Sequence, residues 1–158
     1  MSLRTFPLFC LTALLAQGCK RDAPAPPSAP GVASAAAAQA PSFRQEIAPV
    51  LAQNCASARG CHGVEMDNSV GLDLRPEHSY AELVGHIAFE RDNARRVVPG
   101  SPRDSFLIAK LTGDLHAREG EAMPLDPRTR GPRQPNPLPP DFVERVLKPW
   151  IAAGAPDN

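Results

Sequence analysis

The chain has 158 residues, in which 17 lysines and arginines balance 17 aspartates and glutamates. This length allows one domain of ordinary size. Zero net charge, without a run of basic residues, argues against nucleic acid as a partner and against a polybasic membrane patch. Aromatic residues make up only 5% of the chain and there are 19 prolines, so the composition disfavours an all-β sandwich and favours small helices joined by proline-rich loops.

Residues 1–18 have the features of a secretory signal peptide. A short start with one arginine precedes an apolar run over 6–16, which is about half of the ~20 residues needed to span a bilayer, and small residues lie just before Cys19. This order resembles a bacterial lipoprotein signal, which implies cleavage before Cys19 and lipidation of that cysteine. Cleavage by an ordinary signal peptidase is the alternative. We therefore expect an exported chain that is lipid-anchored in the bacterial cell envelope, in the periplasm or at the outer membrane.

Residues 19–42 are expected to form a disordered, lipidated linker. The stretch 23–41 contains only Ala, Pro, Ser, Gly, Val and Gln, and such a mixture cannot bury enough apolar surface to offset the entropy of the chain. The linker would let a folded domain, residues 43–158, stand off from the membrane.

Apolar residues at helical spacing predict a helix near each end of that domain. Ser42 and Gln45 form a capping box before the first helix, which should run toward Asn54 and which Pro49 must kink or restart. The second helix should follow a capping box of Asp141 and Glu144 and end before Gly154. Its apolar face consists of Val143, Val146, Leu147, Trp150 and Ile151.

Two shorter helices are expected between them. Ser79 and Glu82 predict the start of one, with an apolar face formed by Tyr80, Leu83, Val84 and Ile87. The other should be introduced by Ser101, Pro102 and Asp104 and run over 106–111. Gly85 and Gly113 are expected to end these helices. Seven prolines between Pro124 and Pro140 predict a long irregular loop.

The most informative segment holds Cys55 and Cys61, which five residues separate, and His62 directly after them. In a Cys-x-x-Cys-His run the two thiols add to the two vinyl groups of haem and the histidine coordinates the iron. Cys61 and His62 preserve the second half of this pattern. The wider spacing departs from the first half, although the longer loop costs little closure entropy.

Two other interpretations of the cysteines stay open. In an oxidising compartment, Cys55 and Cys61 are well suited to a plain disulfide, which would leave His62 as a surface residue. A zinc site would need a fourth ligand that the spacing does not nominate.

A series of short motifs runs from Pro49 to the end of the chain. In chain order they are Pro49-Val50-Leu51, Cys55, Cys61-His62-Gly63, Gly71-Leu72-Asp73-Leu74, Val98-Pro99-Gly100-Ser101-Pro102, Ser105, Met123-Pro124, Trp150-Ile151 and Gly154-Ala155. In this series the sequence resembles the planctomycete-type cytochrome c domain found in bacterial surface lipoproteins. The resemblance implies an all-α, small cytochrome c-like helical fold with long proline-rich loops around one covalently bound haem c, with His62 and a methionine as axial ligands.

Chain length decides which methionine can be the second axial ligand. Met66 lies four residues beyond His62, a span of at most ~14 Å when fully extended, and the attachment at Cys61 would pin it to the near side of the ring. Met123 lies 61 residues beyond His62, in the loop before the last helix, and is assigned the sixth position. The alternatives are that Met123 fills a gap in the core and that His116 is the distal ligand.

These features lead us to expect a membrane-tethered monohaem cytochrome c that passes single electrons between periplasmic or surface protein partners and is not an enzyme by itself. The alternative is a haem-free surface lipoprotein that serves adhesion or assembly. In this alternative a disulfide between Cys55 and Cys61 cross-links the helical domain. A peroxidase-like site would need an open position on the iron, which ligation by Met123 would contradict. His78 and His86 are expected to be surface residues.

Overall fold

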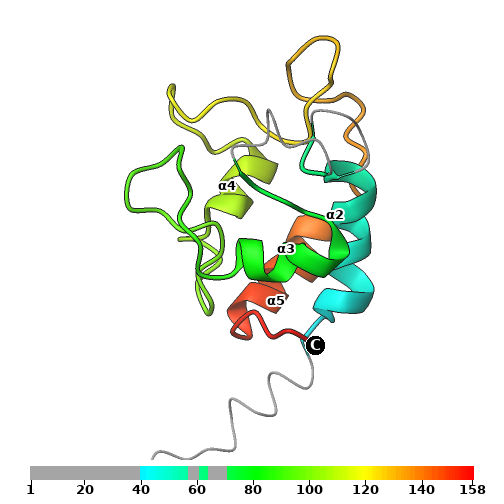
Figure 1. Cartoon of the computed structure of the whole chain (residues 1–158), viewed down its shortest axis with the longest axis vertical. Coiled ribbons are helices and arrows are strands. Elements are labelled where there is room, and N and C mark those ends of the chain that lie inside the picture. The colour runs from blue at the N-terminus through cyan, green and yellow to red at the C-terminus, as the bar shows by residue number, and fades with distance from the viewer. Residues whose placement is uncertain (1–39, 57–60, 64–70) are drawn as a thin grey trace, which may run out of the picture.

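The computed structural model describes residues 40–56, 61–63 and 71–158 (Figure 1), and in these ranges the chain forms helices and no strand. The predicted all-α class is therefore confirmed for this part of the chain. None of its helices is long and apolar enough to cross a bilayer. The helices are η1 (Phe43–Ile47), α2 (Ala48–Cys55), α3 (Pro76–Leu83), α4 (Phe106–Thr112), η3 (Phe142–Leu147) and α5 (Lys148–Ala152). The signal peptide, Cys19 and Met66 lie outside the described residues.

The first predicted helix exists as two continuous parts, a π-helical turn, η1, followed by α2. The Ser42 hydroxyl accepts a hydrogen bond from the Gln45 N–H at 3.2 Å, as expected of an N-cap. The return bond of the capping box comes from Glu46, whose carboxylate accepts from the Ser42 N–H at 2.7 Å, because the first turn is wider than an α-helical turn. Pro49 lies in the first turn of α2, so the predicted restart at this proline is confirmed.

The last predicted helix also begins with a π-helical turn, η3, which continues into α5. The capping box predicted for Asp141 and Glu144 is wrong. Asp141 has a left-handed backbone (φ 58°) instead of the extended backbone of an N-cap, and its side chain makes no capping hydrogen bond. Gly154, with φ 97°, follows the end of α5 as expected.

The short helix α3 begins four residues earlier than predicted and ends before the predicted apolar face is complete. Pro76 occupies its first turn, and Ser79 is a buried residue inside the helix instead of its cap. The helix ends at Leu83, Gly85 follows with φ 79°, and Ile87 is left outside with 58% of its surface exposed. The helix therefore begins at a first-turn proline and has no side-chain cap. The spacing of apolar residues alone did not indicate this start.

The helix α4 begins later than the expected cap at Ser101. The Ser101 hydroxyl donates to the Asp104 carboxylate at 2.6 Å, and the Ser105 hydroxyl donates to the Ser101 carbonyl at 2.8 Å. These bonds make residues 101–105 a separate turn, and the helix starts at Phe106. Gly113, with φ 80°, ends it as predicted. The predicted proline-rich loop is also confirmed, since residues 124–140 contain no helix or strand.

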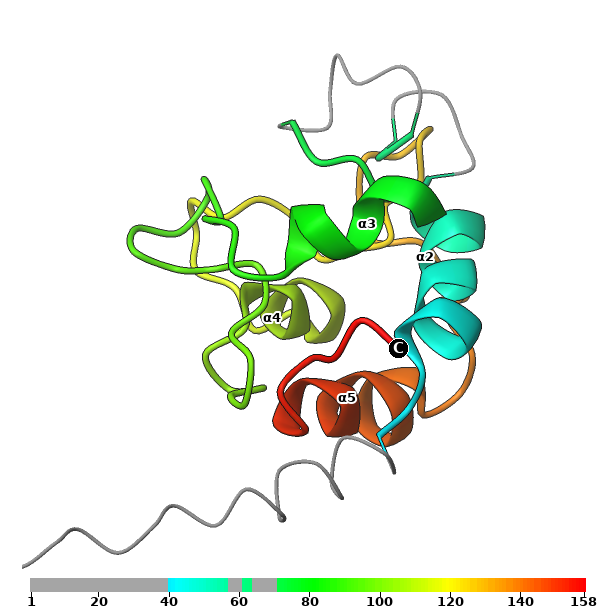
Figure 2. The same cartoon turned by 60° about the horizontal axis from the view of Figure 1, so that its bottom comes forward.

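Figure 2 shows how the helices are arranged. Besides a small cluster of Ala88, Phe106 and Ala109, the buried apolar side chains form one main core. Phe43 lies at its centre, with its ring 5.1 Å from that of Trp150 and 5.2 Å from that of Tyr80. The largest side chains with almost no exposed surface come from both ends of the domain and from α3: Phe43, Ile47, Leu51, Leu83, Leu147, Trp150 and Ile151. Burial of these side chains holds the first and last helices together.

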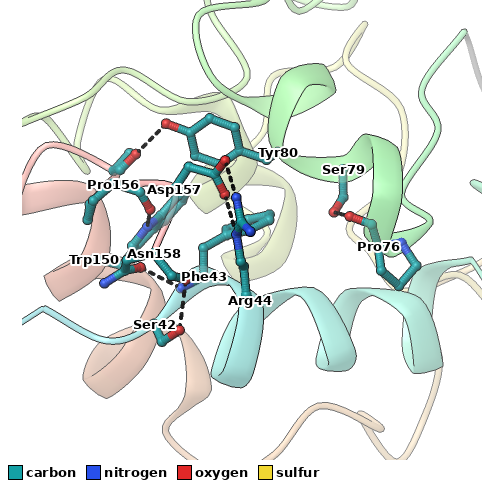
Figure 3. A network of polar contacts seen from close by, with 11 residues as sticks. Ser42, Phe43, Arg44, Pro76, Ser79, Tyr80, Trp150, Pro156, Asp157 and Asn158 are labelled. Atoms are coloured by element: carbon teal, nitrogen blue, oxygen red, sulfur yellow. Dashed lines mark hydrogen bonds and ion pairs between the residues drawn. The ribbon is translucent and has the colours of Figure 1, made fainter.

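The C-terminal residues tie these helices to one another by hydrogen bonds (Figure 3). The Asn158 side chain accepts from the Phe43 N–H at 2.8 Å, and the Trp150 indole donates to the Pro156 carbonyl at 2.8 Å. Arg44 pairs with Asp157 at 2.8 Å. This network closes the end of the domain near α5, while the C-terminal end of α2 and the loops after α4 lie at the other end (Figure 1).

Candidate functional site

A cavity of about 310 Å³ lies where α2 ends and α4 passes beneath the start of the proline-rich loop. Its volume is at the lower end of the range of about 300–1,000 Å³ typical of small-molecule sites. The wall is predominantly apolar, with leucines from several elements. The lining residues include Leu72, Leu74, Leu83, Phe106, Leu107, Leu111, Pro124 and Leu125, together with Asn54, Cys55, Cys61, His62, Met123 and four charged residues.

Cys55, Cys61 and His62 line one part of this cavity. Cys55 is the last residue of α2 and has 9% of its surface exposed. The His62 N–H donates to the Cys55 carbonyl at 2.9 Å, and the His62 carbonyl accepts from the Leu74 N–H at 2.8 Å. Backbone hydrogen bonds therefore hold the Cys61-His62 pair between the end of α2 and the segment before α3.

Gly63 allows the chain to pass close to the end of α2. A Cβ atom at this position would overlap the carbonyl oxygen of Ala56. A larger residue would push the neighbouring His62 away from the end of α2, so a glycine is needed here by the close approach of two backbones.

The two cysteines are free thiols in the structure. Burial, with a smaller effect of the nearby Cys61, raises the pKa of Cys55 to about 12, so its thiol is neutral at physiological pH. The described residues contain no group of three or more His, Cys, Asp or Glu side chains that could hold a metal ion.

Met123 lines the same cavity, although it lies 61 residues beyond His62 in the chain. Its N–H donates to the Lys110 carbonyl at 2.8 Å. This bond ties the end of the segment that follows α4, residues 114–123, back to α4. His116, the alternative ligand, is exposed and does not line the cavity. His78 and His86 are also exposed, as predicted. Of the candidate distal ligands that the structure describes, Met123 lines the cavity of Cys61 and His62, and His116 does not.

The cavity carries more positive than negative charge, which the sequence analysis missed. Arg96, Lys110 and Arg130 line it, against Glu90 as the one acidic lining residue. Arg96 is buried and pairs with the Glu82 carboxylate at 2.8 Å. These cations come from three separate segments with no common spacing, so no pattern in the sequence could have indicated that they meet.

The cavity brings together the types of side chain that would hold a covalently bound haem. Two thiols and an imidazole come from one short segment, a thioether comes from a distant loop, and an apolar wall with cations suits an apolar ring that bears carboxylates. Comparison of the chain with known protein families, with curated proteins and with solved structures finds no match.

Proposed function

We propose that the protein is a lipid-anchored monohaem c-type cytochrome that passes single electrons between protein partners in the bacterial cell envelope. The observation that carries the proposal is that Cys55, Cys61, His62 and Met123 line a single cavity. These four residues were candidates in the sequence because of their side-chain chemistry. They lie together because α4 and the loop that follows it bring Met123 to the cavity. The cytochrome c-like fold is part of this proposal.

Each of these side chains has one role in the proposal. Cys55 and Cys61 would hold the haem covalently: each S–H would add across a vinyl double bond to give one C–S and one C–H bond, so attachment would need no oxidant. His62 and Met123 would hold the iron. Haem bound in this way supplies one-electron transfer at its iron, and ligation by methionine raises the reduction potential.

The other lining residues set the surroundings of the haem. Leu72 and Leu74, before α3, and Leu107 and Leu111, in α4, would exclude water from the haem and give the ring apolar surroundings. Arg130 would supply positive charge for the propionate groups, whereas the charge of Arg96 is already paired with the Glu82 carboxylate. With His62 and Met123 both holding the iron, the haem would supply electron transfer and not substrate binding, so we propose an electron carrier that is not an enzyme by itself.

The remaining part of the proposal concerns location. Lipidation of Cys19 anchors the chain, and the linker 19–42 widens the distance over which the domain can meet its redox partners.

The test is to produce the chain in a host that has haem-attachment machinery and to measure covalent haem. We expect a red protein with the alkaline pyridine spectrum of a c-type haem and an intact mass that includes haem after denaturation. The variants Cys61→Ser and Cys55→Ser should each lose one thioether bond. A colourless product whose mass is two hydrogens below that of the dithiol would refute the cytochrome and support the haem-free lipoprotein with a Cys55–Cys61 disulfide.

A further inference from the structure

Lys110 is a buried cation that the proposed haem chemistry does not use. It lies in α4, and only 9% of its surface is exposed. Its ammonium group donates to the Glu119 carbonyl at 2.7 Å and to the Glu121 carbonyl at 3.2 Å. Buried charged groups are costly unless they are paired or hydrogen-bonded, so the loop that supplies these carbonyls is what makes the burial of Lys110 tolerable.

The same residue also holds the end of this loop by its backbone. The Lys110 carbonyl accepts the hydrogen bond from the Met123 N–H at 2.8 Å. Gly120 has φ 75°, and a Cβ atom there would be 3.4 Å from the Lys110 ammonium nitrogen. The loop therefore folds closely over the lysine, with contacts to both its ammonium group and its carbonyl.

A second cation fixes the other side of the loop. Arg91 binds the Glu119 carboxylate through two nitrogens at 2.6 and 2.7 Å, and this carboxylate also accepts from the His116 N–H at 2.9 Å. Glu119 has only 4% of its surface exposed. The two ends of Glu119 are thus held separately, its carboxylate by Arg91 and its carbonyl by Lys110.

We infer that Lys110 is a positioning residue that holds the loop 114–123 against α4 and thereby keeps the Met123 side chain in the cavity. The inference rests on the proposed function only for the statement that Met123 binds iron. The positioning itself follows from contacts of the chain with itself, and it can be measured whether or not haem is bound.

The test compares Lys110→Met with Lys148→Met, which makes the same change at a lysine of α5 that pairs with Glu144 and does not line the cavity. We expect amide hydrogen exchange at Met123 to accelerate about tenfold or more in Lys110→Met, because hydrogen bonds from charged groups are strong, and to stay unchanged in Lys148→Met. Lys110→Arg, which keeps the donors, should restore part of the protection.

If haem is bound, the affinity of Lys110→Met for added imidazole should be at least about tenfold higher than that of the parent protein. The reason is that the loop 114–123 is released more easily, so the Met123 thioether competes less well with imidazole for the iron. Unchanged exchange at Met123 would overturn the inference, and so would equal acceleration in α2, which would show global destabilisation instead. A chain without haem would refute the proposed function and leave the exchange experiment decisive for Lys110.

A measurement on the unaltered protein covers the case in which Lys110→Met does not fold. A through-hydrogen-bond coupling between the Lys110 side-chain nitrogen and the Glu119 carbonyl carbon is expected in the NMR spectrum. A lysine ammonium that exchanges rapidly with solvent and shows no coupling would overturn the inference.

Discussion

Replacement of Met123 by alanine should separate attachment of the haem from its ligation. The attachment depends on Cys55, Cys61 and His62, whereas Met123 comes from the loop after α4 and would act only as the sixth ligand. Met123→Ala should therefore keep a covalently bound haem. The weak absorption band at the red end of the spectrum that reports sulfur-to-iron bonding should vanish, and the potential should fall, because methionine ligation raises it.

The cost of this change to stability should be moderate. A fully buried methionine replaced by alanine costs about 2–5 kcal/mol, and Met123 is only half-buried, so about half of that, roughly 1–2 kcal/mol, is expected. In a domain of about 100 residues each kcal/mol lowers Tm by about 4–8 °C, so such a loss should lower Tm by roughly 4–16 °C. The variant should thus stay folded at room temperature, so that changes in spectrum and potential report ligation and not unfolding.

The assay combines the absorption spectrum, a redox titration and a thermal melt on Met123→Ala, with Met66→Ala and His116→Ala as controls. Both controls should keep the band and the potential. His116 is exposed and outside the cavity, which is the reason for expecting no effect there. The reasoning would be refuted if Met123→Ala left the spectrum and potential untouched while His116→Ala altered both.

Three further predictions concern the anchor, an acid-sensitive ion pair and the core. Cys19→Ala should release the protein from the membrane fraction, and retention after a salt wash would contradict the lipoprotein anchor. Hydrogen bonds from Arg91 lower the pKa of Glu119 from 4.5 to about 2, so the stability that this carboxylate contributes is present above pH 4.5 and is lost as the pH falls toward 2. Melts should therefore show Glu119→Gln less stable than the parent at pH 7, with a difference that shrinks near pH 2; an equal difference at both pH values would show that ionisation plays no part. Trp150→Phe removes the donor to Pro156 at 2.8 Å, and should cost about 1–3 kcal/mol in urea unfolding, whereas an unchanged midpoint would show that this bond contributes nothing.

The local chemistry of the chain determined much of the domain. Apolar spacing indicated the helices at its two ends, Pro49 marked the start of α2, and Gly113 marked the end of α4. These features depend on residues three or four positions apart or on the backbone of one residue, so they can be read from the sequence. The predicted cap at Asp141 was wrong because the backbone there is left-handed, which the residue type does not dictate.

The cysteines, His62 and Met123 were nominated by their chemistry alone, but only the tertiary structure decided which of the candidates meet. Met123 reaches the cavity, and His116, seven residues earlier in the same loop, does not. The difference comes from the contacts of that loop with Lys110 and Arg91. Such contacts join residues that no periodic pattern links, because they depend on how the loop folds back over α4, and the packing of α4 itself depends on the whole core.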